Sequence, residues 1–191
     1  MFTIIILLVL FVILGTFAYA GYSAAPWLPM RKYDIERFCQ FANIRPGERF
    51  YDLGCGDGRI VCAVAQRGAQ STGYEISILP YLLAKLRCFL QGIPLSSIQY
   101  RNLWTSNLSN ADTVFFYLLP QMQARLKEKL EKELKEGARV ITYAWPIEGW
   151  QPINVDEKPD KLKLYLYRML DSRLHGNDIV DLSTNMIQEN R

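Results

Sequence analysis

Three glycines and two acids, closely spaced between residues 52 and 58, are the residues in this chain best suited to binding chemistry. They follow the apolar residues Phe50 and Tyr51, which predict a short buried strand. Glycines at every second position let the backbone turn sharply and bring its N–H groups close to a ligand. The residues that we expect to form this binding loop are Asp52, Gly54, Cys55, Gly56, Asp57 and Gly58.

A second acid about twenty residues on narrows the class of ligand. Glu75 closes a predicted strand at residues 71–75, where nucleotide-binding folds place the acid that binds a ribose. Glycine loops of this kind also bind dinucleotides, but Asp52 would repel a diphosphate and attract an amino group. S-adenosylmethionine carries an amino group and a sulfonium and has no phosphate, so it fits these acids better. The alternative is a tight turn that needs its glycines for backbone reasons alone.

Predicted strands and helices that alternate along the chain would position this loop. A helix starts at Arg59, and further helices are expected at residues 34–42, capped by Asp34, at 79–90 and at 122–135. The apolar run at 112–119 is typical of a central parallel strand that is buried on both faces. The sequence therefore predicts an α/β fold with a mostly parallel sheet. Its strands are expected at residues 50–53, 71–75, 98–101, 112–119 and 138–144, followed by a closing antiparallel hairpin at 155–157 and 162–168.

The N-terminal segment has the length and composition of a membrane span. Residues 1–20 carry no charged side chain, and a helix from Phe2 to Ala20 would be about 28 Å long, close to the roughly 30 Å of a hydrocarbon core. Tyr19, Tyr22 and Trp27 would form an aromatic belt at the interface. The alternative is a cleaved signal peptide, since residues 18–20 form an A-x-A site, but no basic residue precedes the apolar run.

Composition excludes several other classes of protein. The four cysteines show no metal-binding spacing and are expected to be buried thiols in a reducing compartment. His175 is the single histidine, so neither a histidine-based triad nor a metal site is expected. A net charge of +3, without a basic run, argues against a nucleic acid partner.

The residues around the glycine loop resemble motif I of the class I S-adenosylmethionine-dependent methyltransferases, and Glu75 resembles the acid of their motif II. Later segments, among them Leu103-Trp104 and Leu119-Pro120-Gln121-Met122, are similar to the membrane-anchored protein-lysine methyltransferases that include the enzyme modifying the ATP synthase c-subunit. The resemblance implies a Rossmann-like seven-strand sheet behind one transmembrane helix. Composition and the resemblance together divide the chain into an anchor (1–22), a linker (23–32), a methyltransferase domain (33–170) and a flexible tail (171–191).

The same resemblance implies roles for individual residues. The glycine loop would carry the methionyl part of S-adenosylmethionine, with Asp52 and Asp57 on its amino group and Glu75 on its ribose. Ile76, Asn102 and Leu103 would contact the adenine. Asn102 departs from the family, in which many members have an aspartate at this position.

The acceptor is expected beside Tyr117, the one catalytic candidate, at the end of the central strand. Related enzymes place Asn/Asp-Pro-Pro-Tyr here, whereas this chain has Tyr117-Leu118-Leu119-Pro120. Trp145 and Trp150 would line the acceptor slot or pack in the core. The segment at residues 30–33 also departs from the family, which leaves open how the methionyl end is covered.

Three functions remain open on the sequence. The first is a lysine methyltransferase that acts on a small membrane protein, the second is a methyltransferase for a quinone or lipid, and the third is a membrane protein that binds the cofactor without catalysis. Because Arg31, Lys32 and Arg37 follow the apolar segment, we expect a single-pass protein of a bacterial inner membrane with its domain in the cytoplasm.

Overall fold

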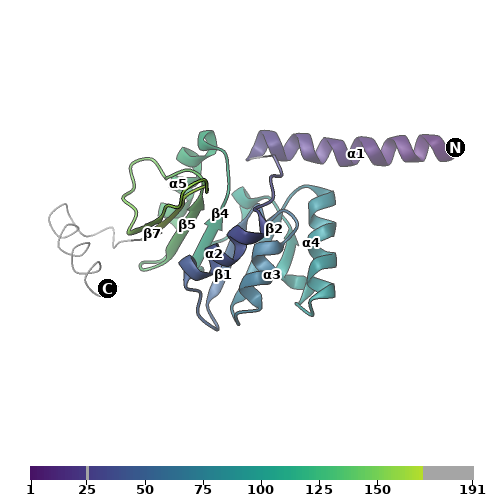
Figure 1. Cartoon of the computed structure of the whole chain (residues 1–191). Coiled ribbons are helices and arrows are strands. Elements are labelled where there is room, and N and C mark those ends of the chain that lie inside the picture. Colours follow the sequence, from purple (N-terminus) through teal and green to yellow (C-terminus); the bar gives the residue numbers. More distant parts are fainter. Residues whose placement is uncertain (25, 170–191) are drawn as a thin grey trace.

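A computed structural model describes residues 1–24 and 26–169 of the chain (Figure 1). The predicted tail at residues 171–191 lies outside the described residues. The strands are β1 (Arg49–Leu53), β2 (Gln70–Glu75), β3 (Ile98–Tyr100), β4 (Thr113–Phe116), β5 (Arg139–Tyr143), β6 (Asn154–Asp156) and β7 (Leu164–Arg168). The helices are α1 (Phe2–Ser23), α2 (Lys32–Ala42), α3 (Arg59–Ala65), α4 (Ile78–Leu90) and α5 (Gln123–Glu133), with short 3-10 turns η1 (Leu95–Ser97), η2 (Leu103–Thr105) and η3 (Pro120–Met122).

The seven strands form one sheet in the order β3-β2-β1-β4-β5-β7-β6. Strands β1 to β5 pair in parallel, whereas β7 runs antiparallel to both β5 and β6. This arrangement confirms the predicted α/β fold and its closing hairpin. The chain moves outward from β1 to β3 and then returns to place β4 on the other side of β1. Ligands bind in open α/β sheets at such a reversal, beyond the carboxyl ends of the strands.

Alternation along the central strands separates two apolar layers. In β4, Val114 and Phe116 pack into one core cluster, whereas Phe115 between them packs into the other. The first cluster is completed by Leu126 and Leu130 of α5, which gives that helix its apolar stripe. A second cluster, on the opposite face, includes Phe38 of α2, whose ring centroid lies 4.6 Å from that of Phe115. Burying both faces explains why the sequence of β4 is continuously apolar.

Helix α1 is apolar on all sides and extends away from the sheet domain (Figure 1). Its length and composition would suffice to cross a membrane, and none of its most apolar window is buried. The C-terminal part of α1 nevertheless contacts the domain through hydrogen bonds. The Ile78 N–H donates to Thr16 Oγ1 (3.3 Å), and the Trp104 indole N–H donates to the Ser23 carbonyl (3.0 Å). The end of α1 and the domain are therefore packed together rather than joined by a flexible linker.

Helix α2 differs from the prediction at its N-terminus. It starts at Lys32, so Asp34 lies inside the first turn and does not cap the helix. The Asp34 carboxylate is buried and accepts hydrogen bonds from Tyr143 (2.7 Å) and Arg37 (3.2 Å) instead. Arg37 also contacts Asp156 of β6 at 2.5 Å. These ion pairs tie α2 to the closing hairpin, a tertiary role that helix-cap patterns do not reveal.

Candidate functional site

A cleft of about 800 Å³, partly open to solvent, lies beyond the carboxyl ends of β1, β2 and β4. Every residue predicted to bind the cofactor lines the cleft except Gly58. The structure thus brings Asp52 and Glu75, from neighbouring strands, to one shared site. The lining residues from the prediction are Asp52, Gly54, Cys55, Gly56, Asp57, Glu75, Ile76, Asn102 and Leu103.

The glycine loop is shaped by backbone conformations that only glycine adopts easily. Gly54, Gly56 and Gly58 all have positive φ, at 90°, 55° and 72°. A Cβ on Gly58 would lie 2.9 Å from the Ala84 side chain, so this glycine lets α4 approach the loop rather than facing the cleft. The N–H groups of Gly54 and Cys55 both donate to the Tyr74 carbonyl, at 3.0 and 2.9 Å. These bonds fix the loop against β2.

Glu75 is held in place by three backbone hydrogen bonds. Its Oε2 accepts from the Gly56 N–H (2.9 Å), and its Oε1 accepts from the N–H groups of Ile76 (2.8 Å) and Ser77 (2.7 Å). A carboxylate offers about four lone-pair sites. Three are therefore used inside the protein, and this arrangement leaves capacity for about one further donor from the cleft. The side chain is buried, which preorganises it for a hydroxyl group.

The two aspartates of the loop have different surroundings. Asp57 forms ion pairs with Arg59 (2.6 Å) and Arg87 (2.7 Å). Although burial acts in the opposite direction, these arginines hold the pKa of Asp57 below its usual value. For Asp52, burial comes first and the charges of Glu75 and Asp57 second, and together they raise the pKa of its carboxyl well above the usual range. Asp52 therefore lacks the positive charges with which the arginines stabilise the ionised form of Asp57.

The predicted adenine side is partly occupied by contacts within the chain. Asn102 accepts a hydrogen bond from the Trp104 N–H on its Oδ1 (3.0 Å), and its Nδ2 donates to the Tyr19 hydroxyl of α1 at 3.4 Å. The Asn102 side chain, which is predicted to contact the adenine, thus also caps η2. Leu103 is buried, and Ile76 lines the same part of the cleft.

On the predicted acceptor side, Tyr117 lines the cleft and belongs to an aromatic cluster. Its ring stacks on Trp145, with centroids 5.7 Å apart and an interplanar angle of 24°, and meets the edge of Tyr143 at 4.9 Å. Burial raises the pKa of the Tyr117 hydroxyl. Trp150 lies elsewhere, since it packs on Tyr167 and donates to Glu131 (2.9 Å). The structure thus brings Trp145, but not Trp150, next to the catalytic candidate.

One wall of the cleft was not predicted as part of the site. The end of α1 and the following segment line it through Ala20, Ser23, Ala24 and residues 26–30. Trp27 is the most prominent of these, because a Cβ on Gly56 would lie 2.6 Å from its indole Nε1. That nitrogen is buried and has no hydrogen-bond partner among the described residues. The sequence predicts Trp27 in an interfacial aromatic belt, whereas the structure places its indole against the glycine loop. Pro26 and Pro29, which restrict the backbone on both sides of Trp27, are a local signal of a fixed segment.

The chemistry of these side chains fits S-adenosylmethionine. Buried carboxylates without a matching cation favour a positively charged ligand, and the unpaired Trp27 N–H beside the glycine loop offers a donor for a carboxylate. The methionyl part carries both an ammonium and a carboxylate group. A nucleotide diphosphate would find Asp52 instead of a cation at the same place.

Comparison with known proteins agrees with this chemistry. Residues 52–154 match the family model described as the ANTKMT methyltransferase domain. The chain is 35% identical over 133 residues to the human lysine N-methyltransferase of the ATP synthase c-subunit, a match that covers 68% of this chain and 56% of the human protein. It is 33% identical over 148 residues to a protein-lysine N-methyltransferase of Saccharolobus islandicus, covering 74% of this chain and 92% of that protein.

A solved structure extends the similarity to the fold. An RNA methyltransferase from Salinibacter ruber, in complex with S-adenosyl-L-homocysteine, superposes with a TM-score of 0.71 at 25% identity. The superposition covers 78% of this chain and 98% of that one. The ligand in that complex is the demethylated product of S-adenosylmethionine, so a structural neighbour binds the same nucleoside.

Proposed function

Because the chain belongs to the ANTKMT methyltransferase family, whose members use S-adenosylmethionine, we propose that it is a protein-lysine N-methyltransferase acting at a membrane. The observation that carries the proposal is the shared cleft of Asp52 and Glu75, with the glycine loop between them. Lysine as the acceptor is supported by the relatives, which are named as lysine methyltransferases. Since the chain spans little more than half of the human protein's length, its acceptor is our inference.

The cofactor would be bound by charge and by backbone shape. Asp52 would pair with its ammonium group, and the Trp27 indole N–H would donate to its carboxylate above Gly56. Glu75 would accept a ribose hydroxyl with its remaining lone pair. Leu103 and Ile76 would enclose the adenine. In this arrangement Asp57 shapes the loop through Arg59 and Arg87 and leaves the ammonium to Asp52.

The residues on the acceptor side would align and desolvate an amine. S-adenosylmethionine supplies a methyl group that its sulfonium already activates. A lysine ammonium would lose its proton to solvent before the amine attacks, and a half-buried aromatic slot at Tyr117 and Trp145 would lower its pKa by desolvation. The N–C bond would form as the C–S bond of the sulfonium breaks, and S-adenosylhomocysteine would leave. The ring faces would then attract the methylated cation. No strong base is needed, because alignment and removal of water supply most of the rate.

Action at a membrane is supported by α1 and by the side of the cleft that α1 forms. The helix is long and apolar enough to span a bilayer, and its last turns line the cleft. Arg31 and Lys32, both exposed, follow it, so the domain would lie in the cytoplasm of a single-pass protein of a bacterial inner membrane. Arg37, the third predicted positive charge, is buried against Asp34 and Asp156 and adds little to that bias.

A methyltransferase for a quinone or lipid is the second candidate. It is favoured by the apolar residues Ala20, Ala24 and Leu28, which line the cleft where α1 ends. An acceptor dissolved in the bilayer would reach the site along this wall. Such an acceptor would also suit the aromatic slot at Tyr117.

Labelling of membranes separates these functions. Membranes from cells that lack the gene would be incubated with the full chain and S-adenosylmethionine carrying a radioactive methyl group. Our proposal expects the label to run with a protein band and, after hydrolysis, to co-elute with methylated lysine. Label that extracts into organic solvent would support the quinone or lipid candidate. No label in either fraction, with the cofactor bound, would favour a non-catalytic protein. Asp52→Asn serves as the matched control.

A further inference from the structure

Helix α4 exposes an apolar surface that a soluble protein would cover with polar residues. Its inner side, with Ala84 and Cys88, packs on α3, and both residues are fully buried. The opposite side is apolar as well, and Leu82, Phe89 and Leu90 are 54%, 70% and 72% exposed. We call this surface the α4 apolar face. It consists of Leu79, Leu82, Leu83, Leu86, Phe89 and Leu90. A helix that is apolar on both sides is normally covered on the second side as well, either by another apolar protein surface or by lipid.

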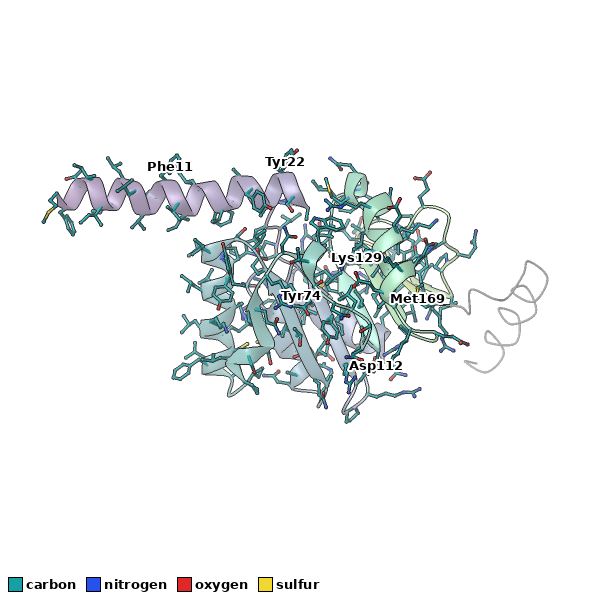
Figure 2. The ribbon with its side chains drawn as sticks, turned by 180° about the vertical axis from the view of Figure 1, so that it is seen from behind. Phe11, Tyr22, Tyr74, Asp112, Lys129 and Met169 are labelled. Atoms are coloured by element: carbon teal, nitrogen blue, oxygen red, sulfur yellow. The ribbon has the colours of Figure 1, made fainter. Side chains whose placement is uncertain are left out.

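The position of α1 indicates which partner. Helix α1 contacts the start of α4, where Thr16 Oγ1 accepts the Ile78 N–H. In Figure 1, α1 runs crosswise over the end of α4 and continues beyond the domain on the outer side of α4. Figure 2 shows, from behind, that side chains of α4 project toward that same outer side. A bilayer crossed by the free part of α1 would therefore run parallel to α4 and meet its outer surface.

Polar groups on α4 do not oppose this contact. The Lys85 amine donates to the Leu95 carbonyl (2.7 Å), and Arg87 pairs with Asp57. Both cations are thus bonded back to the domain and do not project among the leucines. Long basic side chains at the edge of an apolar helix face are also typical of helices that lie in a lipid interface.

We propose that the α4 apolar face lies in the interface of the bilayer that α1 spans, as a second attachment of the domain to lipid. The depth agrees with this geometry. If Phe2, the first residue of α1, is placed at the far boundary of a hydrocarbon core of about 30 Å, Thr16 lies about 21 Å along the helix and so about 9 Å inside the near boundary. Interfacial helices bury their apolar face by about 5–10 Å. This inference rests on the membrane placement proposed for α1.

The attachment would also define the class of acceptor. Ala20, Ser23 and Ala24 line the cleft and follow Thr16 by about 6 to 12 Å along the helix. The entrance of the cleft would therefore lie at the level of the lipid headgroups. A lysine would reach it from a membrane protein whose side chain emerges at that level, whereas a lysine far above the surface would not.

Fluorescent labels on the full chain in lipid vesicles test this inference. Single cysteines would be introduced as Leu86→Cys or Phe89→Cys on α4, as Leu10→Cys on α1, and as Lys132→Cys on exposed α5 as the matched control. The four native thiols are buried, and the unmodified chain serves as the blank for labelling. Each label would be challenged with nitroxide lipids, which quench from within the bilayer, and with iodide, which quenches from water.

We expect nitroxide lipids to reduce emission about twofold or more at Leu10, Leu86 and Phe89, while the label at Lys132 responds to iodide alone. If nitroxide lipids quench the label at position 10, whereas both α4 labels are quenched by iodide like the label at position 132, then α1 spans the membrane and the α4 inference is wrong. Labels on α4 that neither quencher reaches would identify a second copy or another protein on this face, and would also overturn the inference. If the Leu10 label is not quenched by lipid, the membrane placement fails together with it.

Discussion

Asp52 connects the stability of the unliganded protein to its affinity for a cation. Its carboxyl is buried and faces the charges of Glu75 and Asp57, and both effects raise its pKa. Ionising this group in the empty cleft therefore costs free energy that a bound ammonium would offset. The same residue that destabilises the free domain would contribute to selective binding of the cofactor.

The first prediction concerns the pH dependence of this cost. Because the pKa of Asp52 is higher in the folded than in the unfolded chain, protonation of this carboxyl stabilises the fold. This stabilisation is fully present below about pH 4 and is lost as the pH rises through the raised pKa of the folded state. We therefore expect unliganded Asp52→Asn to unfold at a higher temperature than the wild type at pH 7, with a smaller difference at pH 4. Thermal unfolding at both values measures this, and with added cofactor the order should reverse.

Glu75 offers a second prediction. Glu75→Ala removes one charged hydrogen bond to the ribose, worth about 1.5–3 kcal/mol, so cofactor affinity should fall by about tenfold to a hundredfold. It also leaves the N–H groups of Gly56, Ile76 and Ser77 without their acceptor, which should lower stability. Calorimetric titration below the variant's unfolding temperature separates the two effects. Unchanged affinity would remove Glu75 from the binding site.

Trp27 provides a test of the wall that the sequence did not predict. Trp27→Phe keeps an aromatic ring at this position but removes the indole N–H together with part of the ring volume, a loss of volume that the control Trp150→Phe shares. If that donor binds the cofactor's carboxylate, affinity should fall by about tenfold, since a bond to a charged group contributes at least about 1.5 kcal/mol. Calorimetry on Trp27→Phe, with Trp150→Phe as the matched control away from the cleft, measures the difference. Equal affinity for both variants would contradict the role of Trp27.

At the scale of elements, the position of the glycine loop depends on a close contact between β2 and the loop at Gly73. A Cβ on Gly73 of β2 would lie 2.7 Å from the side chains of Cys55 and Val61. Only a residue without a side chain lets β2, the loop and α3 meet at this distance. Gly73 thus sets the spacing between the strand that ends in Glu75 and the loop that Glu75 holds.

We expect Gly73→Ala to lower the free energy of unfolding by about 1–3 kcal/mol, because an added methyl group forces packed side chains apart. It should also weaken cofactor binding, since the loop would shift away from Glu75. Ser71→Ala in the same strand is the matched control. The Ser71 hydroxyl is buried without a partner among the described residues, so its removal should leave stability equal or higher. Denaturant unfolding of both variants gives the comparison.

The elements themselves were largely predictable, because their signals are local. Periodicity and glycine positions were enough for β1, α3 and β2, and the apolar alternation around Leu164 was enough for the closing hairpin. The capping role of Asp34 was wrong, since its partners Tyr143 and Arg37 make it a buried tertiary contact. The central strand is also shorter than predicted, ending at Phe116, which leaves Tyr117 free to turn into the cleft.

The closure of the cleft could not be read from the sequence. Residues 26–30 look like a linker locally, and their contact with Gly56 depends on how α1 packs against the domain. The pairing of Asp57 with Arg87 likewise joins residues from two elements, and no spacing rule connects them. The sequence therefore predicted the acids and, apart from Gly58, the glycines that line the cleft, but not the wall that covers them.

At the scale of the whole molecule, α1 combines the membrane anchor that we propose with part of the wall of the cleft. Deleting residues 1–14 keeps Thr16, Tyr19 and Ser23 and their contacts with the domain, so cofactor affinity should remain near that of the full chain. Deleting residues 1–24 removes those contacts and part of the cleft wall, and affinity should fall. Titration of both forms in mild detergent measures the difference. Equal affinities would mean that α1 serves attachment alone.

The hydrogen bonds between the end of α1 and the domain also bear on how the enzyme would find its target. If α1 spans a membrane, as we propose, a catalytic domain held to it by these bonds would not move through the surrounding solution on a flexible linker. Enzyme and target would meet only by lateral diffusion within one sheet of lipid. The encounter rate would then depend on the number of molecules per unit of membrane area rather than on their concentration in the cell volume.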